Sequence, residues 1–183
     1  MASLTQADPA QSNSTDLRFT LASPSDENLV VSIYTEIGTW LHQSKGITGQ
    51  WFKQLSCSDA RHFINTGELY VVFKGEDNIG ALRLSAEPDH LWTDCPAIAL
   101  YLHSLAVRRA FAGQDLGRTM LAWAEEQAKA AGKSYLRLDC MAGNSYLRRY
   151  YTDAGYTPLG IHPQHRFFAL FEKPVAPKHP MGD

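Results

Sequence analysis

Cysteine is scarce in this chain, with three residues in 183. Cys57, Cys95 and Cys140 are odd in number and lack the close spacing of metal-binding cysteines. This usage argues against a disulfide framework and fits free thiols in a reducing compartment. We therefore expect a cytoplasmic protein that uses no metal.

The chain also lacks long apolar runs, an excess of charge and an early basic residue. No window approaches the roughly 20 apolar residues of a membrane span, and the first Lys or Arg is Arg18, so no signal or transit peptide is expected. A formal net charge of −2 with 20% charged residues provides no bulk field for nucleic acid or an anionic membrane. We expect neither partner, so any anionic ligand must be held locally.

The length of the chain predicts one domain with a core of its own. Residues 1–16 carry almost no large apolar side chain and are expected to be disordered. Residues 17–173 form the expected domain, and the proline-rich residues 174–183 are expected to be a flexible tail. No internal repeat is present.

Apolar periodicity predicts seven strands and four helices. The strands are expected over residues 18–22, 68–74, 79–87, 97–107, 134–140, 156–161 and 166–171. The helices are expected over residues 24–44, 50–64, 116–131 and 145–154. Ser23, Pro24 and Asp26 form a helix-start signal, and Asn144 is an N-cap for the last helix. A four-residue turn, 75–78, is expected to join the second and third strands.

The stretch LHSLAVRRAFAGQDLGR, residues 102–118, joins an apolar strand to a small-residue turn and a long helix. Gly113 and Gly117 permit the turn, and the free N–H groups at the start of the helix suit a phosphate. A strand, turn and helix without a ligand is the alternative. A P-loop is excluded because the chain has no GxxxxGK(S/T) motif.

The order of these elements resembles the GCN5-related N-acetyltransferase superfamily, from about residue 18 to residue 171. In that family a Leu-Ala-Val-like strand end precedes a loop of the form Arg/Gln-x-x-Gly-x-Gly/Ala, and here Leu105-Ala106-Val107 precedes Ala112-Gly113-Gln114-Asp115-Leu116-Gly117. Ala112 and Asp115 depart from the pattern. Asn144 and the segment Tyr151-Thr-Asp-Ala-Gly155-Tyr156 are similar to the family's Asn and Tyr-x-x-x-Gly-Phe segment.

This resemblance implies an α/β (α+β) fold with a mixed, mainly antiparallel twisted sheet of about seven strands flanked by four helices. It implies acetyl-CoA as the co-substrate and a bulge near residues 105–107 whose free backbone groups pair with the pantetheine arm. No metal is implied. The residues expected to bind the coenzyme are Leu105, Ala106, Val107, Gly113, Gln114, Asp115, Leu116, Gly117, Arg118 and Asn144, with Arg108 as a further cation for the pyrophosphate.

Two catalytic residues follow from the same resemblance. Tyr151 is the expected general acid for the departing thiolate, and a tyrosine of the core is the alternative. Tyr150 points about 100° away on a helix, so the two tyrosines cannot share one role. The segment 102–111 is similar to arylalkylamine N-acetyltransferases, which makes His103 the candidate base. A hydrogen-bonded core histidine is the equal alternative.

Carboxylates and aromatic side chains are candidates for the acceptor site. Glu36 and Trp40, on the first helix, are the expected substrate-binding pair. The remaining candidates are Glu68, Asp94 and Trp51, with Asp139 and Cys140 as further lining residues. Solvated carboxylates and core tryptophans are the alternatives. Cys140 is not expected to act as a nucleophile.

The sequence therefore predicts an acyltransferase that moves an acetyl group from acetyl-CoA to a primary amine, by direct attack in a ternary complex. The expected acceptor and partner is a small-molecule amine, and a homodimer is compatible with the sequence. A non-catalytic sensor of acyl-CoA is the alternative, motivated by Ala112 and Asp115. A peptide or protein amine stays open as acceptor.

Overall fold

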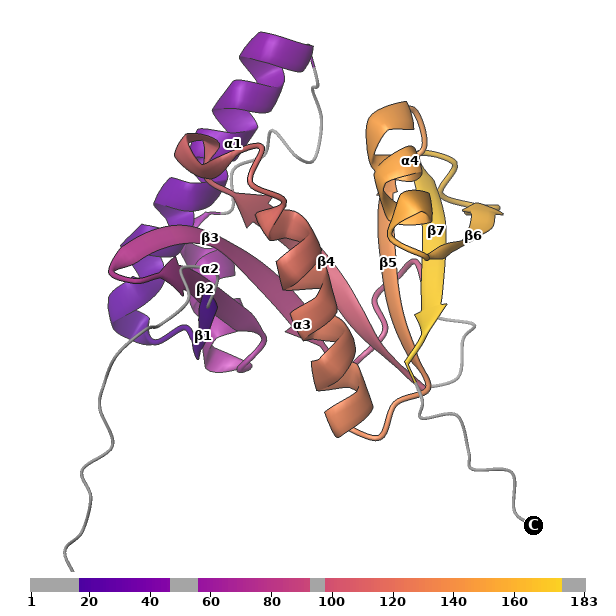
Figure 1. The fold of residues 1–183 in the computed structure, drawn as a ribbon, viewed down its shortest axis with the longest axis horizontal. Coiled ribbons are helices and arrows are strands. Elements are labelled where there is room, and N and C mark those ends of the chain that lie inside the picture. Colours follow the sequence, from indigo (N-terminus) through magenta and orange to yellow (C-terminus); the bar gives the residue numbers. More distant parts are fainter. Residues whose placement is uncertain (1–16, 47–55, 93–97, 176–183) are drawn as a thin grey trace, which may run out of the picture.

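The computed structural model describes residues 17–46, 56–92 and 98–175, which form one mixed sheet with helices on both faces (Figure 1). The strands are β1 Leu17–Leu21, β2 Leu69–Lys74, β3 Asp77–Ser85, β4 Ala99–Val107, β5 Tyr135–Met141, β6 Thr157–Ile161 and β7 Phe168–Pro174. The helices are α1 Glu27–Lys45, α2 Cys57–Asn65, α3 Leu116–Ala130 and α4 Ser145–Asp153, with short 3-10 turns at Pro24–Asp26 and Arg109–Phe111.

The sheet has the strand order β1-β2-β3-β4-β5-β7-β6, and only β4 and β5 run parallel to each other. That parallel pairing is short, because it joins residues 99–102 to residues 135–138 and then stops. Beyond Leu102 and Leu138 the two strands separate, which opens the sheet at its centre (Figure 1). The predicted mixed, mainly antiparallel sheet flanked by four helices is confirmed.

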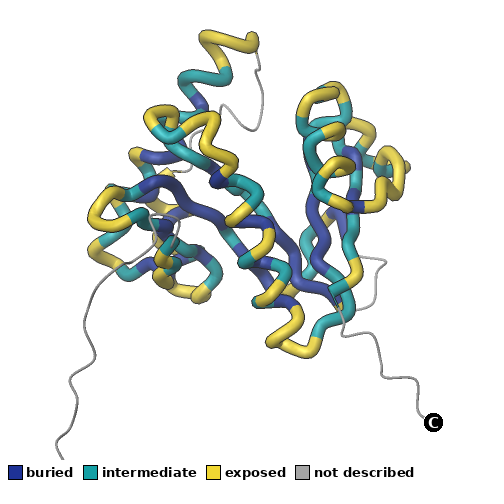
Figure 2. The backbone as a smooth tube through the Cα atoms, in the orientation of Figure 1, coloured by how far each residue is buried: buried dark blue, intermediate teal, exposed yellow. Residues whose placement is uncertain are grey.

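The described residues form three buried clusters, and the two larger ones take alternating side chains of β2 and β3. Val71 and Ala81 pack with α1 and α2, whereas Val72 and Leu82 pack with α3 and the inner side of α4. This alternation follows from the two-residue repeat of a strand. Figure 2 shows the buried centre of the sheet and the exposed outer surfaces of the helices. No helix within the described ranges is long and apolar enough to cross a membrane.

The helix-start signals act as the sequence predicts. Ser23 and Asp26 form a reciprocal capping box ahead of α1, and the Asn144 side chain accepts a hydrogen bond from the Leu147 N–H at the start of α4. Gly46 ends α1 with φ 61°, a conformation that glycine adopts without strain. These local signals operate because each needs only neighbours three or four residues away.

Several predicted boundaries differ from the structure. The β2–β3 connection is a tight turn of two residues, 75 and 76, because the strands continue pairing to Lys74 and Asp77. Helix α2 begins at Cys57, where the Ser56 side chain accepts a hydrogen bond from the Asp59 N–H, and the predicted helical residues 50–55 lie outside the described residues. Strand β7 extends to Pro174. The predictions for residues 1–16 and 176–183 lie outside the described residues.

Candidate functional site

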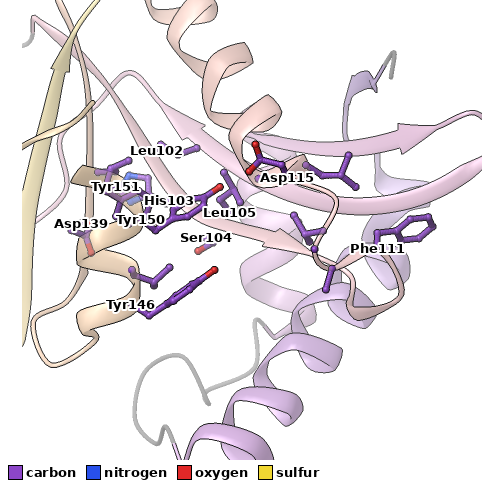
Figure 3. Close-up of a pocket in the computed structure, with 17 residues that line it drawn as sticks. Leu102, His103, Ser104, Leu105, Phe111, Asp115, Asp139, Tyr146, Tyr150 and Tyr151 are labelled. Atoms are coloured by element: carbon purple, nitrogen blue, oxygen red, sulfur yellow. The ribbon is translucent and has the colours of Figure 1, made fainter. Parts of the chain in front are cut away.

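A cavity of about 360 Å³ lies where β4 and β5 separate (Figure 3). It runs from the loop before α3, at Gly113 and Asp115, to His103 and Asp139 deep in the sheet. Strand β4 forms one wall, and β5 with α4 forms the other. The structure thus brings most of the predicted site residues to one place.

A bulge in β4 shapes the wall of the cavity. Ala81 pairs with Ala106, and Arg83 pairs with His103, so β4 carries one extra residue between these two pairs. Ser104 lies in this bulge with φ 51°, an uncommon value for a residue other than glycine. The predicted bulge is confirmed, slightly earlier in the strand than expected.

The bulge and the lost pairing leave one edge of β4 open to the cavity. Pairing with β5 ends at Leu102, while Leu105 and Val107 line the cavity further along the strand. Ala106 is buried on the other face of the sheet, so only its backbone can reach a ligand in the cavity. An open strand edge with free N–H and C=O groups can pair with an extended amide chain.

The loop before α3 presents backbone N–H groups. Asp115 adopts a left-handed conformation, with φ 55° and ψ 19°, and the first N–H groups to bond back to its carbonyl are those of Arg118 and Thr119. The N–H groups of Leu116 and Gly117 therefore lack a partner within the helix, as expected at a helix start. The Asp115 side chain is 77% exposed, so its carboxylate turns to solvent while its N–H stays with the loop.

Gly117 lies directly under the Tyr150 hydroxyl. A Cβ at this position would lie 2.6 Å from that oxygen, closer than real contacts allow. Helix α4 thus approaches the start of α3 at a point where only glycine leaves room. This close approach explains a glycine here independently of any phosphate.

Arg108 and Arg118, the two arginines predicted to bind the pyrophosphate, contact other groups of the protein. Arg108 contacts the carboxylate of Glu36, the hydroxyl of Ser32 and the amide oxygen of Asn78, so it is not free for a pyrophosphate. Arg118 donates to the Asp153 carbonyl at 2.8 Å, which ties α3 to α4.

Lys74 is a cation at the loop that sequence reasoning missed. Its Nζ donates to the Gln114 side-chain oxygen at 3.1 Å. Lys74 ends β2, 40 residues before Gln114, and only the pairing of β2, β3 and β4 brings the two together. No local motif carries this signal.

Tyr151 and Tyr150 both line the cavity but reach different parts of it. Tyr151 packs its ring against Tyr156 and Phe171, with centroids 6.1 and 5.7 Å away, near Asp139. Burial raises the pKa of the Tyr151 hydroxyl, which stays protonated at neutral pH. Tyr150 reaches the start of α3, and burial, assisted by the Asp115 charge, raises its pKa to about 12. The two side chains therefore serve different places, as their spacing predicts.

His103 lies at the deep end of the cavity, with a side chain that is 9% exposed. Burial and the Arg83 charge lower the pKa of its imidazole to about 4, although Asp89 and Glu68 act in the opposite direction. Its Nδ1 is 3.9 Å from an Asp89 carboxylate oxygen, and its Nε2 is buried without a hydrogen-bond partner among the described residues. The core-histidine alternative, which assumed a satisfied imidazole, does not describe this side chain.

Asp139 and Cys140 end the strand that faces His103. Burial, and secondly the Asp89 charge, raise the pKa of Asp139 to about 7. Burial, and secondly Asp139, raise the pKa of the Cys140 thiol to about 12. A thiol with this pKa carries almost no thiolate at neutral pH, in agreement with the expectation that Cys140 is not a nucleophile.

The predicted substrate-binding pair lies away from the cavity. The Glu36 carboxylate binds Arg108 and accepts a hydrogen bond from the Arg109 N–H at 2.7 Å, so it holds the chain just after β4. The Arg109 guanidinium stacks on the Trp40 ring at 3.8 Å. In the structure both side chains hold the segment after β4, and the assignment of Glu36 and Trp40 to the amine stays a prediction. Trp51 and Asp94 lie outside the described residues.

Comparisons with known proteins place this architecture in a family. The model of the acetyltransferase (GNAT) family matches residues 31–156. The uncharacterised N-acetyltransferase YesJ of Bacillus subtilis is 32% identical over 158 residues, which cover 82% of this chain and 86% of YesJ.

Solved structures agree with that match. A GNAT-family acetyltransferase from Listeria monocytogenes has 26% identity and a TM-score of 0.74, covering 86% of this chain and 94% of its own. The PaiA N-acetyltransferase of Thermoplasma acidophilum, solved with coenzyme A, has the same fold at 18% identity and a TM-score of 0.69, with 87% and 99% of the two chains covered. A protein from Salmonella typhimurium solved with its cofactor acetyl-CoA shares the fold at 15% identity and a TM-score of 0.63, with 92% and 98% covered. The chain described here belongs to the acetyltransferase (GNAT) family.

Proposed function

We propose that this protein transfers an acetyl group from acetyl-CoA to the primary amine of a small molecule, by direct attack in a ternary complex. One observation carries the proposal. A single cavity in the split between β4 and β5 joins the backbone N–H groups before α3 to the ionisable side chains of His103 and Asp139. A coenzyme held at one end places its thioester toward the other end, where a proton acceptor is available.

The residues of the first end fit acetyl-CoA. The N–H groups of residues 113–117, at the positive end of α3, suit the pyrophosphate, and Lys74 adds a cation beside Gln114. The open edge of β4 over residues 103–107 suits the amides of the pantetheine arm. Two proteins of the same fold were solved with coenzyme A or acetyl-CoA, which supports acetyl-CoA as the ligand.

Arg118 and Asn144 contribute to the coenzyme site through other residues in this proposal. Arg118 holds α4 against the start of α3 through the Asp153 carbonyl. Asn144 caps α4 and so fixes the helix that carries both tyrosines. Each residue shapes the cavity wall instead of contacting the phosphates.

Acetyl-CoA supplies the acetyl group as a thioester, and transfer forms an amide C–N bond while the C–S bond breaks. Tyr151 is the proposed acid, because its protonated hydroxyl lies in the cavity beside β5. His103 is proposed to accept a hydrogen bond from the amine, since a neutral imidazole with an unpartnered nitrogen lines the same end. A pKa near 4 makes this imidazole a weak base, so it needs a stronger acceptor beside it.

Calorimetric titration with acetyl-CoA, followed by thiol release across a panel of small amines and an N-terminal peptide, tests the proposal. Binding with thiol release on small amines supports it. Binding without thiol release on any amine favours the acyl-CoA sensor, for which Ala112 and Asp115 in the loop are the motivation. Release on the peptide alone identifies a protein amine as acceptor. Absence of binding overturns both the enzyme and the sensor.

A further inference from the structure

Three ionisable side chains meet at the deep end of the cavity. Asp89 follows β3, His103 belongs to β4 and Asp139 belongs to β5, and each offers one ligand atom within 4.8 Å of the other two. His103 and Asp139 line the cavity, and Figure 3 shows both on the side where Tyr151 enters. We call Asp89, His103 and Asp139 the acidic triad.

The acidic triad has polar atoms whose hydrogen-bonding capacity is not used by the described residues. The His103 side chain is more than nine-tenths buried, and its Nε2 has no partner within residues 17–46, 56–92 and 98–175. A buried polar atom without a partner carries a cost of about 1–3 kcal/mol, so such atoms are uncommon unless a ligand satisfies them. The only hydrogen bond to the Asp89 side chain that involves the described residues comes from the Leu91 N–H. Acceptors therefore outnumber donors here.

The spacing of the triad can be compared with the geometry of two kinds of cation. An ammonium donates tetrahedral hydrogen bonds of roughly 2.9 Å, so three acceptors around it lie about 4.7 Å apart. Zinc binds the same ligand types at about 2.1 Å, which brings ligand atoms to about 3.4 Å from one another. The ligand atoms of the triad all lie within 4.8 Å of one another, and Nδ1 of His103 is 3.9 Å from an Asp89 oxygen, so the site has room for an ammonium group as well as for a metal ion.

We propose that the acidic triad is the subsite for the acceptor's primary ammonium group, and that the Asp139 carboxylate takes its first proton. This inference rests on the proposed function. The class of acceptor is then a primary amine with three N–H donors on its cationic nitrogen. A quaternary ammonium, which has no N–H, is excluded.

The proton balance is complete with groups in the cavity. One proton passes from R–NH₃⁺ to an Asp139 oxygen, which leaves R–NH₂ with a lone pair. The C–N bond then forms, the C–S bond breaks, and the leaving sulfur receives a proton from the Tyr151 hydroxyl. The nitrogen's second proton returns through solvent to Tyr151, and Asp139 releases its proton to solvent after the product leaves.

The charges around Asp139 favour this assignment. Asp89 from the β3–β4 connection raises the Asp139 pKa, and the Cys140 thiol and Tyr151 hydroxyl beside it are neutral. On β4, His103 is neutral as well. The triad therefore carries between one and two negative charges near neutral pH, which attract a cation.

Among the described residues, the basic groups that act on His103 are Arg83 and His90, and Arg148 acts on the neighbouring Cys140 thiol. Arg83 faces the imidazole, but its Nε is paired with Glu68 at 2.7 Å. His90 lies on the outer side of Asp89, 3.9 Å from its carboxylate, and its side chain is 58% exposed. Neither side chain belongs to the lining of the cavity. Glu68 therefore offsets part of the Arg83 charge at His103.

The smallest probe of the subsite is methylammonium, because it needs no fit for a longer substrate. We would record the titration of Asp139 by NMR of protein labelled at the Asp carboxyl carbon, with the signal assigned by Asp139→Asn. The expected result is a lower Asp139 pKa in methylammonium chloride, since a bound cation stabilises the carboxylate. Tetramethylammonium chloride at the same ionic strength should leave the pKa unchanged.

Variants sharpen the same measurement. Asp89→Asn should reduce the response of Asp139 to methylammonium several-fold, because one acceptor loses its charge. Glu126→Gln is the matched control, since this carboxylate lies on α3 with its side chain 71% exposed. It should respond as the wild type does. Unchanged binding of acetyl-CoA by Asp89→Asn would show that the variant is folded.

Three results would overturn the proposal. These are no shift with methylammonium, an equal shift with tetramethylammonium, and stoichiometric binding of Zn²⁺ to the triad in place of the methylammonium effect. None of them depends on the coenzyme. Failure of acetyl-CoA to bind the wild type would instead remove the proposed function, so the two failures are distinguishable.

Discussion

The two ends of the cavity recognise their ligands by different means. At the start of α3 the groups that face the cavity are backbone N–H groups, and side chains such as Asp115 point to solvent. At the acidic triad the functional atoms belong to side chains, and these come from three separate parts of the sheet. A site made of backbone N–H groups tolerates many different side chains at its positions. A site made of side-chain atoms depends on the identity of each residue.

This difference explains how the loop can keep the backbone shape proposed to bind phosphate despite its unusual sequence. Asp115 occupies the left-handed conformation that glycine commonly supplies, and aspartate is among the residues that tolerate it. Ala112 and Asp115 therefore depart from the family's sequence pattern while the backbone conformation of the loop is kept. At the triad, by contrast, replacement of any one acceptor changes the chemistry.

The largest loss is expected from Asp139→Asn, which keeps the size of the side chain and removes the proton acceptor. The value of kcat/KM should fall about 10³-fold, within the usual range of general-base catalysis. The dissociation constant of acetyl-CoA, measured by calorimetry, should stay near that of the wild type. An equal loss of coenzyme binding would contradict the separation of the two ends.

The pH dependence gives a second view of the same residue. A base must be deprotonated, so kcat/KM of the wild type should rise with pH up to about 7, the raised pKa of Asp139, and then level off. Asp139→Asn should lose this rise. A wild-type profile that climbs steadily toward the pKa of the free amine would mean that the enzyme takes neutral amine from solution.

Tyr151→Phe ranks next, with an expected fall in kcat of about 10²-fold, because the thiolate must leave without its acid. Steady-state kinetics at saturating acetyl-CoA measures this change. Tyr150→Phe is the matched control one residue away on the same helix. Tyr150→Phe should change the dissociation constant of acetyl-CoA more than it changes kcat, since the Tyr150 hydroxyl lies over Gly117. Equal kcat values for Tyr151→Phe and the wild type would remove Tyr151 from the mechanism.

Gly117→Ala tests the packing of α4 on α3. The added methyl would meet the Tyr150 hydroxyl at 2.6 Å, so the tyrosine must shift into the cavity. We expect acetyl-CoA to bind about tenfold more weakly, equivalent to about 1.4 kcal/mol. Adding Tyr150→Phe to Gly117→Ala removes the clashing oxygen and should restore most of the affinity. A double variant as weak as Gly117→Ala would point to the glycine backbone itself.

The smallest effect is expected at Asp115, on the side that uses backbone groups. Asp115→Gly should tighten acetyl-CoA binding only a few-fold, because the exposed carboxylate repels the phosphates weakly through solvent. Asp115→Asn is the matched control, since it removes the charge and keeps a residue that accepts a positive φ. Equal gains in both variants identify charge as the cause, and high salt should abolish them.

Local features of the fold could be predicted from sequence, whereas contacts across the sheet could not. The Ser23 capping box and the Asn144 cap depend on neighbours in the chain, so residue type and spacing were sufficient. Glu36 binds Arg108, 72 residues away, and nothing in the local pattern of α1 indicates that partner. The contact of Glu36 with Arg108 could not be predicted for this reason.

The candidate site shows the same division. His103, Tyr151 and the loop before α3 lie in recognisable segments, and the structure brings them to one cavity. Asp89 has no motif around it, and its approach to Asp139 depends on the register of three strands. Sequence reasoning missed Asp89 because an acidic residue in a connection is usually solvated.

The short parallel seam between β4 and β5 has a consequence for how the molecule opens. Four residue pairs join β1–β4 to the unit of β5, β6 and β7 within the sheet, so cooperative opening should begin at this seam. A ligand that spans the cavity bridges both sides and stabilises the closed form by mass action. Hydrogen exchange in β5 should therefore slow as coenzyme is added. Saturating acetyl-CoA should also lengthen the time that the protein stays folded on heating.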